Sequence, residues 1–164
     1  MDSSLKVILV GDGGVGKTSF VKMVREREIC DKYFPTEGAD VVEIRTSSEK
    51  KLQLWDCGGR HRGLKDGYWI GAKAGIVMFS VNSARSWDNV KEWIKSISAV
   101  CGDIPLIVVG AKVDLANIEV DKGMVARGLY SLRRKHPSLR YAECSPKIGY
   151  GCDEVVELVS GFFS

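Results

Sequence analysis

Hydrophobic and polar positions follow two different periods along the chain. Apolar runs typical of strands lie at 6–10, 40–46, 51–56, 75–81, 106–111 and 140–144. Stretches with apolar residues three or four positions apart, typical of helices, lie at 17–26, 86–100, 122–135 and 153–162. This alternation predicts an α/β fold, a three-layer sandwich in which helices flank a six-stranded, mainly parallel sheet. The short polar link 47–50 predicts a hairpin, and therefore one antiparallel strand at the sheet edge.

Length and composition fit one unit of this kind. A chain of 164 residues, with 45% hydrophobic and 27% charged residues, can bury one core, so we predict a single domain over residues 1–164 and a monomer. The net charge of +3 is too small to indicate a nucleic-acid partner. The five cysteines are scattered and form no C-x-x-C pair, which favours a reducing, intracellular compartment, cytoplasmic or nuclear, and no structural zinc.

Neither end of the chain resembles a targeting segment. The first residues lack a basic region, and the apolar run that follows them is far shorter than a membrane span. The last four residues contain no cysteine, so we expect no prenylation box at this end. We therefore expect no membrane anchor in this chain.

The most informative motif follows the first predicted strand directly. Residues 11–18, Gly-Asp-Gly-Gly-Val-Gly-Lys-Thr, match the pattern G-x-x-x-x-G-K-[ST]. A backbone rich in glycine lets many N–H donors converge on a polyphosphate, and a helix follows, as the motif requires; the alternative is a glycine-rich turn that ends by chance in Lys-Thr. The motif predicts that Lys17 contacts the β- and γ-phosphates and that the Thr18 hydroxyl ligates Mg²⁺. The predicted phosphate-binding residues are Gly11, Asp12, Gly13, Gly14, Val15, Gly16, Lys17, Thr18 and Ser19.

Two later strands also end in chemically informative residues. Asp56 is placed to hold Mg²⁺, and Gly59 follows it with an N–H for the γ-phosphate. Lys112 and Asp114 follow the strand at 106–111. Guanine presents two adjacent donors that one carboxylate can accept, so Asp114 would select guanine while the stem of Lys112 lies over the ring. A Lys-x-Asp pair alone is common in loops. It indicates a guanine site only because it follows the phosphate loop and Asp56 in order along the chain.

With these motifs the chain resembles the Ras-type small GTPases, and among them the Ran branch most. The general resemblance rests on 11–18, 33–36, 55–59, 112–114 and 143–147, and the Ran-like features are 20–22, 63–69, 78–79 and 133–135. It implies a P-loop NTPase fold and a Mg²⁺-dependent GTP/GDP switch, with a role in nucleocytoplasmic transport. Further nucleotide-binding positions implied by the resemblance are Ile29, Tyr33, Thr36, Ala111, Ser145, Pro146 and Lys147. Thr36 would also ligate Mg²⁺ and contact the γ-phosphate, contacts that hydrolysis removes.

One departure from the family lies at the catalytic corner formed by Lys17, Thr36 and Gly59. Arg60 stands where the family usually has the glutamine that orients the attacking water. A guanidinium has donors and no acceptor, so we expect slow GTP hydrolysis. Arg60 could instead stabilise transition-state charge as an arginine finger within the chain, and this alternative stays open.

Three further departures lie at the base. Ala111 replaces an asparagine, Pro146 replaces an alanine whose N–H donates to guanine O6, and Ile29 replaces a phenylalanine. Each lost contact costs on the order of 1–2 kcal/mol, which together weakens binding by a factor of roughly tens to thousands. We therefore expect guanine nucleotides to bind, but loosely and with weaker discrimination against ATP.

The resemblance also implies protein partners. Effectors and regulators would bind the switch segments 30–40 and 57–69, in a manner that depends on the nucleotide. The basic run Arg133, Arg134 and Lys135 fits an acidic partner, but such a run also suits the solvated end of a helix. Two other functions stay open: a pseudo-GTPase interaction module, and an ATP-dependent phosphoryl-transfer enzyme, which the Lys112 and Asp114 pair disfavours.

Overall fold

The computed structural model describes residues 4–28, 30–36, 39–57 and 67–164, and for 34–36 it describes the backbone alone. The strands are β1 (Leu5–Val10), β2 (Cys30–Thr36), β3 (Ala39–Arg45), β4 (Lys51–Asp56), β5 (Ala74–Ser80), β6 (Leu106–Ala111) and β7 (Arg140–Glu143). The helices are α1 (Lys17–Arg25), α2 (Ala84–Asp88), α3 (Val90–Cys101), α4 (Lys122–Leu132) and α5 (Cys152–Gly161), with a short 3₁₀ turn, η1 (Pro146–Ile148).

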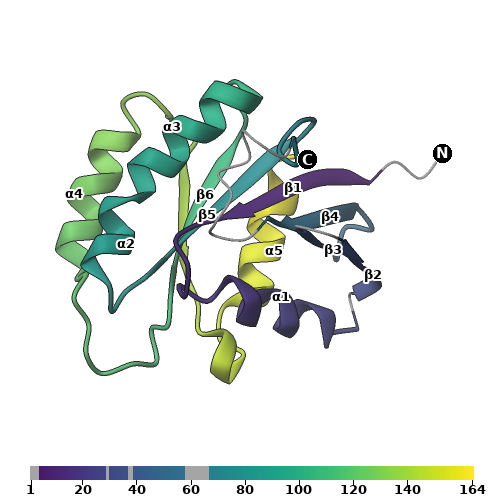
Figure 1. Ribbon diagram of the computed structural model, residues 1–164, viewed down its shortest axis with the longest axis horizontal. Coiled ribbons are helices and arrows are strands. Elements are labelled where there is room, and N and C mark those ends of the chain that lie inside the picture. Colours follow the sequence, from purple (N-terminus) through teal and green to yellow (C-terminus); the bar gives the residue numbers. More distant parts are fainter. Residues whose placement is uncertain (1–3, 29, 37–38, 58–66) are drawn as a thin grey trace.

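These strands form one sheet in the order β2-β3-β4-β1-β5-β6-β7 (Figure 1). Strand β1 pairs in parallel with β4 on one side and β5 on the other, and β6 and β7 continue the parallel part. After β1 the chain goes to the edge at β2 and returns through β3 to β4 beside β1, and it then crosses to the other side of β1 at β5. In such sheets ligands bind beyond the carboxyl end of the strand at which the order reverses. The end of β1 is therefore the expected location of a site.

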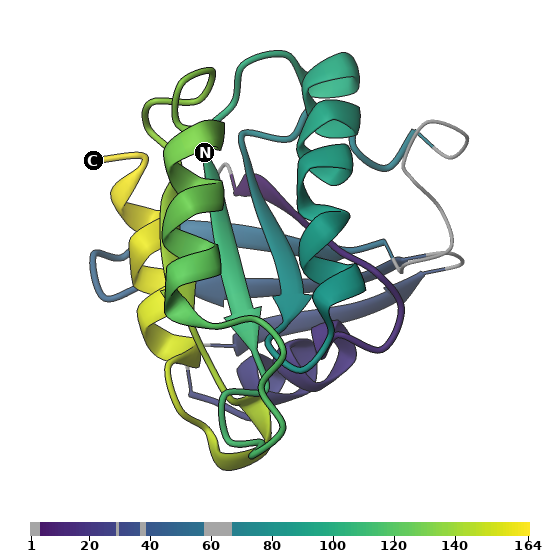
Figure 2. The same cartoon turned by 90° about the vertical axis from the view of Figure 1, so that its left-hand side faces the viewer.

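Helices cover both faces of the sheet, as the sequence predicted. On one face α1 and α5 pack their apolar residues against Val7 and Leu9 of β1. On the opposite face α3 and α4 pack against Ile8 and Val10. Because successive side chains of a strand point to opposite faces, β1 contributes to both cores. Figures 1 and 2 show the resulting three layers. No helix of the described residues is long and apolar enough to cross a bilayer.

Two helices begin at side-chain caps. The Asp121 carboxylate accepts from the N–H of Met124 at the start of α4, and the Ser83 hydroxyl accepts from the N–H of Ser86 in α2. The pattern at 86–100 was predicted as one helix, but it contains two. They meet at Asn89, which ends α2 and precedes α3 with near-helical backbone angles.

The prediction of six strands was wrong by one, because β2 was not recognised. Its residues, Cys-Asp-Lys-Tyr-Phe-Pro-Thr, include two charges and a proline, and so do not read as a strand. In the structure β2 pairs antiparallel with β3, opposing Phe34 to Val41, and it forms the sheet edge. A proline is tolerated at an edge because its missing N–H breaks no ladder there. Strand β3 pairs antiparallel with both β2 and β4, so one strand runs against the others as predicted, but β2 rather than β3 lies at the edge.

Candidate functional site

The loop between β1 and α1 has a backbone that only glycine can supply at its first position. Gly11 has a φ of 150°, and a Cβ built on it would lie 2.2 Å from the carbonyl oxygen of Met78 in β5. Any side chain there would force β1 and β5 apart. The loop ends at Gly16, whose φ of 115° leads into the first turn of α1. The sequence motif thus folds into a tight loop that ends at a helix N-terminus, where unpaired N–H groups favour anions.

Lys17 lies at the centre of this loop. Its ammonium donates to the carbonyl oxygens of Gly11 and Asp12, both at 2.7 Å, and the residue is only 5% exposed. Burial lowers the pKa of Lys17 from its ordinary value, and the carboxylates of Asp56 and then Asp12 oppose that shift. A partly desolvated cation held by backbone oxygens is well placed to interact with phosphate oxygens.

The side chain of Asp12 makes its hydrogen bonds with α3 and the residue before it. Its carboxylate accepts from Asn89 Nδ2 at 2.7 Å and from Trp93 Nε1 at 2.8 Å. Asp12 was predicted from the motif as part of the phosphate loop, but these two partners were not predicted. They lie 77 and 81 residues further along the chain, and nothing in a single sequence pairs them with the loop.

Two of the three residues predicted to ligate a metal, Asp56 and Thr18, have described side chains and lie on neighbouring elements. Asp56 ends β4 and is 7% exposed, close enough to Lys17 to affect its pKa. Thr18 is exposed in the first turn of α1, directly after Lys17. A carboxylate and a hydroxyl are hard oxygen donors, so this part of the predicted set fits Mg²⁺. Thr36 ends β2, but its side chain, together with Ile29, Gly59 and Arg60, lies outside the described residues.

A cavity of ≈480 Å³ joins the loop to the two base motifs. It is lined by predicted residues, Gly16, Ser19, Lys112, Asp114, Pro146 and Lys147, and by Lys22, Met23, Glu26 and Leu115. The last four were not predicted. Lys22 and Met23 lie on α1 and Glu26 caps its C-terminus, and no motif in the sequence marks these positions as part of a site. The structure therefore brings three motifs, far apart in the sequence, around one cavity.

Hydrogen bonds fix the two charged side chains of the base motif. The Ser145 hydroxyl, fully buried, donates to Asp114 Oδ1 at 2.6 Å. The Lys112 ammonium donates to the carbonyl oxygen of Gly14 at 2.6 Å, from a backbone with a φ of 66°. The first bond orients the carboxylate, which keeps lone pairs for further donors. The second ties the base motif to the phosphate loop.

The altered base positions have clear structural consequences. Pro146 is buried at the first position of η1, where it has no N–H to donate. Ala111 is fully buried, and its side chain is a methyl group with no amide to donate a hydrogen bond to the loop or the base.

Tyr33, in contrast, is placed away from the base cavity. Its hydroxyl donates to Asp40 Oδ1 at 3.0 Å, and the guanidinium of Arg25 lies 3.6 Å from its ring centroid. Tyr33 therefore contacts α1 and β3, and it is not among the residues that line the base cavity.

Comparison with known protein families agrees with this geometry. The family model described as "Ras family" matches residues 6–161, almost the whole chain. The match begins in β1 and ends in α5, so it includes the phosphate loop, Asp56 and both base motifs. The chain therefore belongs to the Ras family, the small GTP-binding switch proteins.

Proposed function

We propose that this chain is a Mg²⁺-dependent GTP/GDP switch of the Ran-like type, with loosened base contacts and slow GTP hydrolysis. The observation that carries the proposal is the cavity shared by the phosphate loop, Asp114 and Pro146, with Lys112 bonded to the loop itself. The resemblance to Ran rests on the sequence features at 20–22, 63–69, 78–79 and 133–135.

Each group of the site has a definite role in this proposal. The loop N–H groups and Lys17 bind and neutralise phosphate oxygens, and Asp114 accepts the two donors of guanine. Thr18, Thr36 and Asp56 would hold Mg²⁺, which neutralises phosphate charge when bound. Ras-family GTPases bind GTP or GDP with Mg²⁺ in general, and the oxygen donors of Thr18 and Asp56 are compatible with this.

The switch itself is proposed for the segments 30–40 and 57–69, through which effectors and regulators would bind. Strand β2 belongs to the first of these segments and lies at the sheet edge, paired only with β3. An edge strand can change its pairing without disturbing the central strands. A nucleotide-dependent contact at Thr36 would therefore act on the part of the sheet that is easiest to rearrange.

Arg60→Gln is expected to speed GTP hydrolysis by about 10-fold or more, because the amide oxygen restores an acceptor for the attacking water. The measurement is single-turnover hydrolysis of radiolabelled GTP at saturating protein, compared with a neighbouring change, Arg62→Gln. Unchanged hydrolysis in Arg60→Gln would contradict the assigned role of position 60. A decrease would instead support the arginine-finger alternative.

Pro146→Ala is expected to tighten GDP binding by about 5- to 10-fold, because it restores a backbone N–H worth roughly 1 kcal/mol. The affinity is measured by displacement of a fluorescent GDP. Pro105→Ala, at a loop proline outside the cavity, is the matched control. Equal or weaker binding by Pro146→Ala would mean that position 146 does not face guanine O6.

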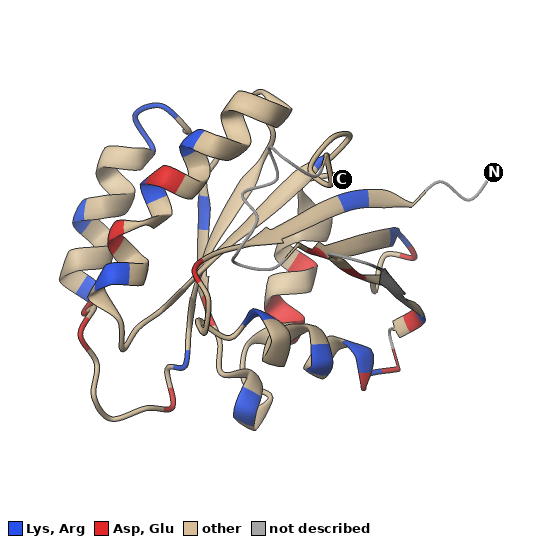
Figure 3. Cartoon of the chain, in the orientation of Figure 1, with Lys and Arg blue, Asp and Glu red and all other residues tan. Residues whose placement is uncertain are grey.

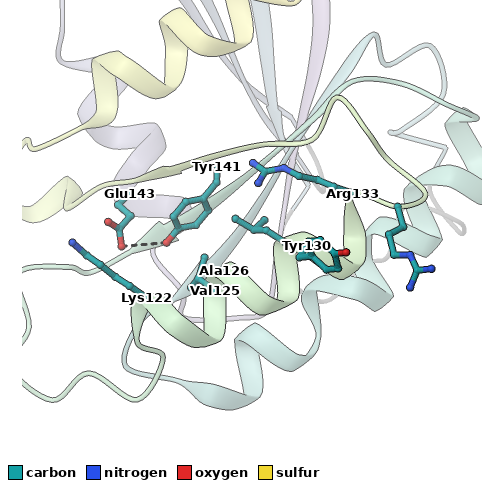
Figure 4. A pocket seen from close by; sticks show the side chains of 9 residues that line it. Lys122, Val125, Ala126, Tyr130, Arg133, Tyr141 and Glu143 are labelled. Atoms are coloured by element: carbon teal, nitrogen blue, oxygen red, sulfur yellow. Dashed lines mark hydrogen bonds between the residues drawn. The ribbon is translucent and has the colours of Figure 1, made fainter.

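An acidic protein segment is the proposed partner of Arg133, Arg134 and Lys135. Residues 122–142 contain six Lys and Arg and no Asp or Glu, while the rest of the chain carries 18 cations against 21 anions. Figure 3 shows these cations along α4 and the turn after it. Beside them, a cavity of ≈640 Å³ between α4 and β7 is lined by Tyr130 and by Tyr141, whose hydroxyl donates to Glu143 (Figure 4). Charge complementarity supports the proposal.

The second candidate is a pseudo-GTPase that binds nucleotide for structure alone. Arg60, Ala111 and Pro146 favour it, because each replaces a group used for hydrolysis or base binding. The same single-turnover assay separates the two functions. Measurable hydrolysis by the wild-type chain supports the slow switch, whereas GTP that stays intact on the protein for many hours supports the pseudo-GTPase.

A further inference from the structure

The phosphate loop has little packing support at its tip. A Cβ built on Gly13 or Gly14 would meet no heavy atom of the described residues within 4 Å. Behind the loop, on the α3 side, lies a polar cavity of ≈480 Å³, lined by residues 12–15 of the loop and by residues of the β5-to-α3 segment. Val15 anchors the loop in the core, but at Gly13 and Gly14 packing gives no support, so hydrogen bonds also contribute to the position of the loop.

Two hydrogen bonds cross to α3 at this cavity, and both reach one carboxylate. Asn89 Nδ2 and Trp93 Nε1 donate to the two different oxygens of Asp12, at 2.7 and 2.8 Å. The same residue's carbonyl oxygen accepts from Lys17 at 2.7 Å. Asp12 thus bonds the α3 side through its carboxylate and the Lys17 ammonium through its carbonyl oxygen. In the proposed function, that ammonium contacts the phosphates.

The two donors are not explained by helix formation alone. Asn89 precedes α3, but its side chain makes no capping hydrogen bond there. Trp93 is 3% exposed and packs against Trp69, with ring centroids 6.3 Å apart. Packing accounts for the indole ring but not for the direction of its N–H. Hydrogen bonds to a carboxylate are among the stronger ones in proteins, so both donors stabilise the observed orientation of the Asp12 carboxylate.

The carboxylate also has to be kept away from the polyphosphate. Asp12 lies in the loop that binds an anion, and a carboxylate that turned toward the phosphates would repel them. The donors of Asn89 and Trp93 hold it toward α3. We propose that Asn89 and Trp93 are positioning residues for nucleotide binding, which act through Asp12 to fix the phosphate loop and Lys17. This inference rests on the proposed nucleotide-binding function.

A charge exchange tests the proposal. Asn89→Asp places two carboxylates face to face and is expected to weaken GDP binding about 10-fold or more. The double variant Asp12→Asn with Asn89→Asp restores an amide-to-carboxylate bond in the reverse direction, and it should return to within about 3-fold of wild type. Trp93→Phe keeps the ring and removes its N–H, so it should weaken binding about 5-fold or more, unlike the matched Trp87→Phe.

The readout is the affinity for fluorescent GDP in Mg²⁺, together with the thermal unfolding midpoint of each nucleotide-free variant. Recovery of affinity in the double variant, with similar midpoints, supports positioning through Asp12. Wild-type affinity in both Asn89→Asp and Trp93→Phe would overturn the proposal, as would a double variant that binds as weakly as Asn89→Asp. If Asn89→Asp does not fold, the GDP affinities of Trp93→Phe and Trp87→Phe are compared instead, and weaker binding by Trp93→Phe alone supports the proposal. A wild-type chain that binds no GDP contradicts the proposed function itself, and this inference falls with it.

Discussion

Asp114→Ala is expected to lower the affinity for GDP by at least about 100-fold, because guanine loses two hydrogen bonds to a charged acceptor, each worth about 1.5–3 kcal/mol. Adenine nucleotides make neither bond, so their affinity should change little. The buried Ser145 hydroxyl, which donates to Asp114 at 2.6 Å, also loses its partner. Measuring GDP and ADP affinities side by side therefore separates loss of base recognition from general damage.

The control for this variant is Asp103→Ala, which removes an exposed carboxylate remote from the cavity. It should bind GDP as the wild-type chain does. If Asp114→Ala retained the preference for guanine over adenine, Asp114 would not read the base, and the assignment of the cavity would be wrong.

Lys17→Met is expected to weaken GTP binding by about 100-fold or more, since it removes the charge-assisted contacts of the ammonium with two phosphates. Methionine keeps most of the side-chain length and avoids the desolvation cost of the 5% exposed ammonium. The carbonyl oxygens of Gly11 and Asp12 lose their donor, so the loop loosens as well. GDP binding should fall less than GTP binding, because GDP has no γ-phosphate.

The comparison with Lys95→Met, an exposed lysine on α3, removes the same charge without touching the loop. Isothermal titration with GDP and GTP gives both affinities, and thermal unfolding reports whether each variant is folded. Similar losses in the two lysine variants would show that only the overall charge matters. An unchanged GTP affinity in Lys17→Met would contradict the loop's role in phosphate binding.

Local patterns predicted the part of the site that follows strands directly. The apolar run before Gly11 and the glycines after it define a strand, a loop and a helix over adjacent residues, and the structure has that arrangement. Asp56, Lys112 and Asp114 were found in the same way, because parallel strands bring their carboxyl ends to one edge of the sheet. Such predictions need only the order of the elements.

Features that depend on contacts between distant residues were not predicted. The donors to Asp12 come from the junction of α2 and α3 and from α3 itself, and Met23 and Leu115 join the base cavity only once α1 and the loop after β6 are placed. Strand β2 was missed for a related reason. Its residues have a low preference for strand structure, and pairing with β3 outweighs that local preference, as tertiary context commonly does.

The central claim is that the cavity beside the phosphate loop recognises guanine. Competition of GDP, GTP, ADP and ATP for the wild-type chain, in Mg²⁺ and against a fluorescent nucleotide, tests it most directly. We predict that GDP and GTP bind at least about 100-fold more tightly than ADP and ATP, because Asp114 accepts two donors that adenine lacks. Pro146 removes one further contact to guanine, so the preference should be smaller than with a backbone N–H at that position. Equal or tighter binding of the adenine nucleotides, or no binding of GDP, would contradict it.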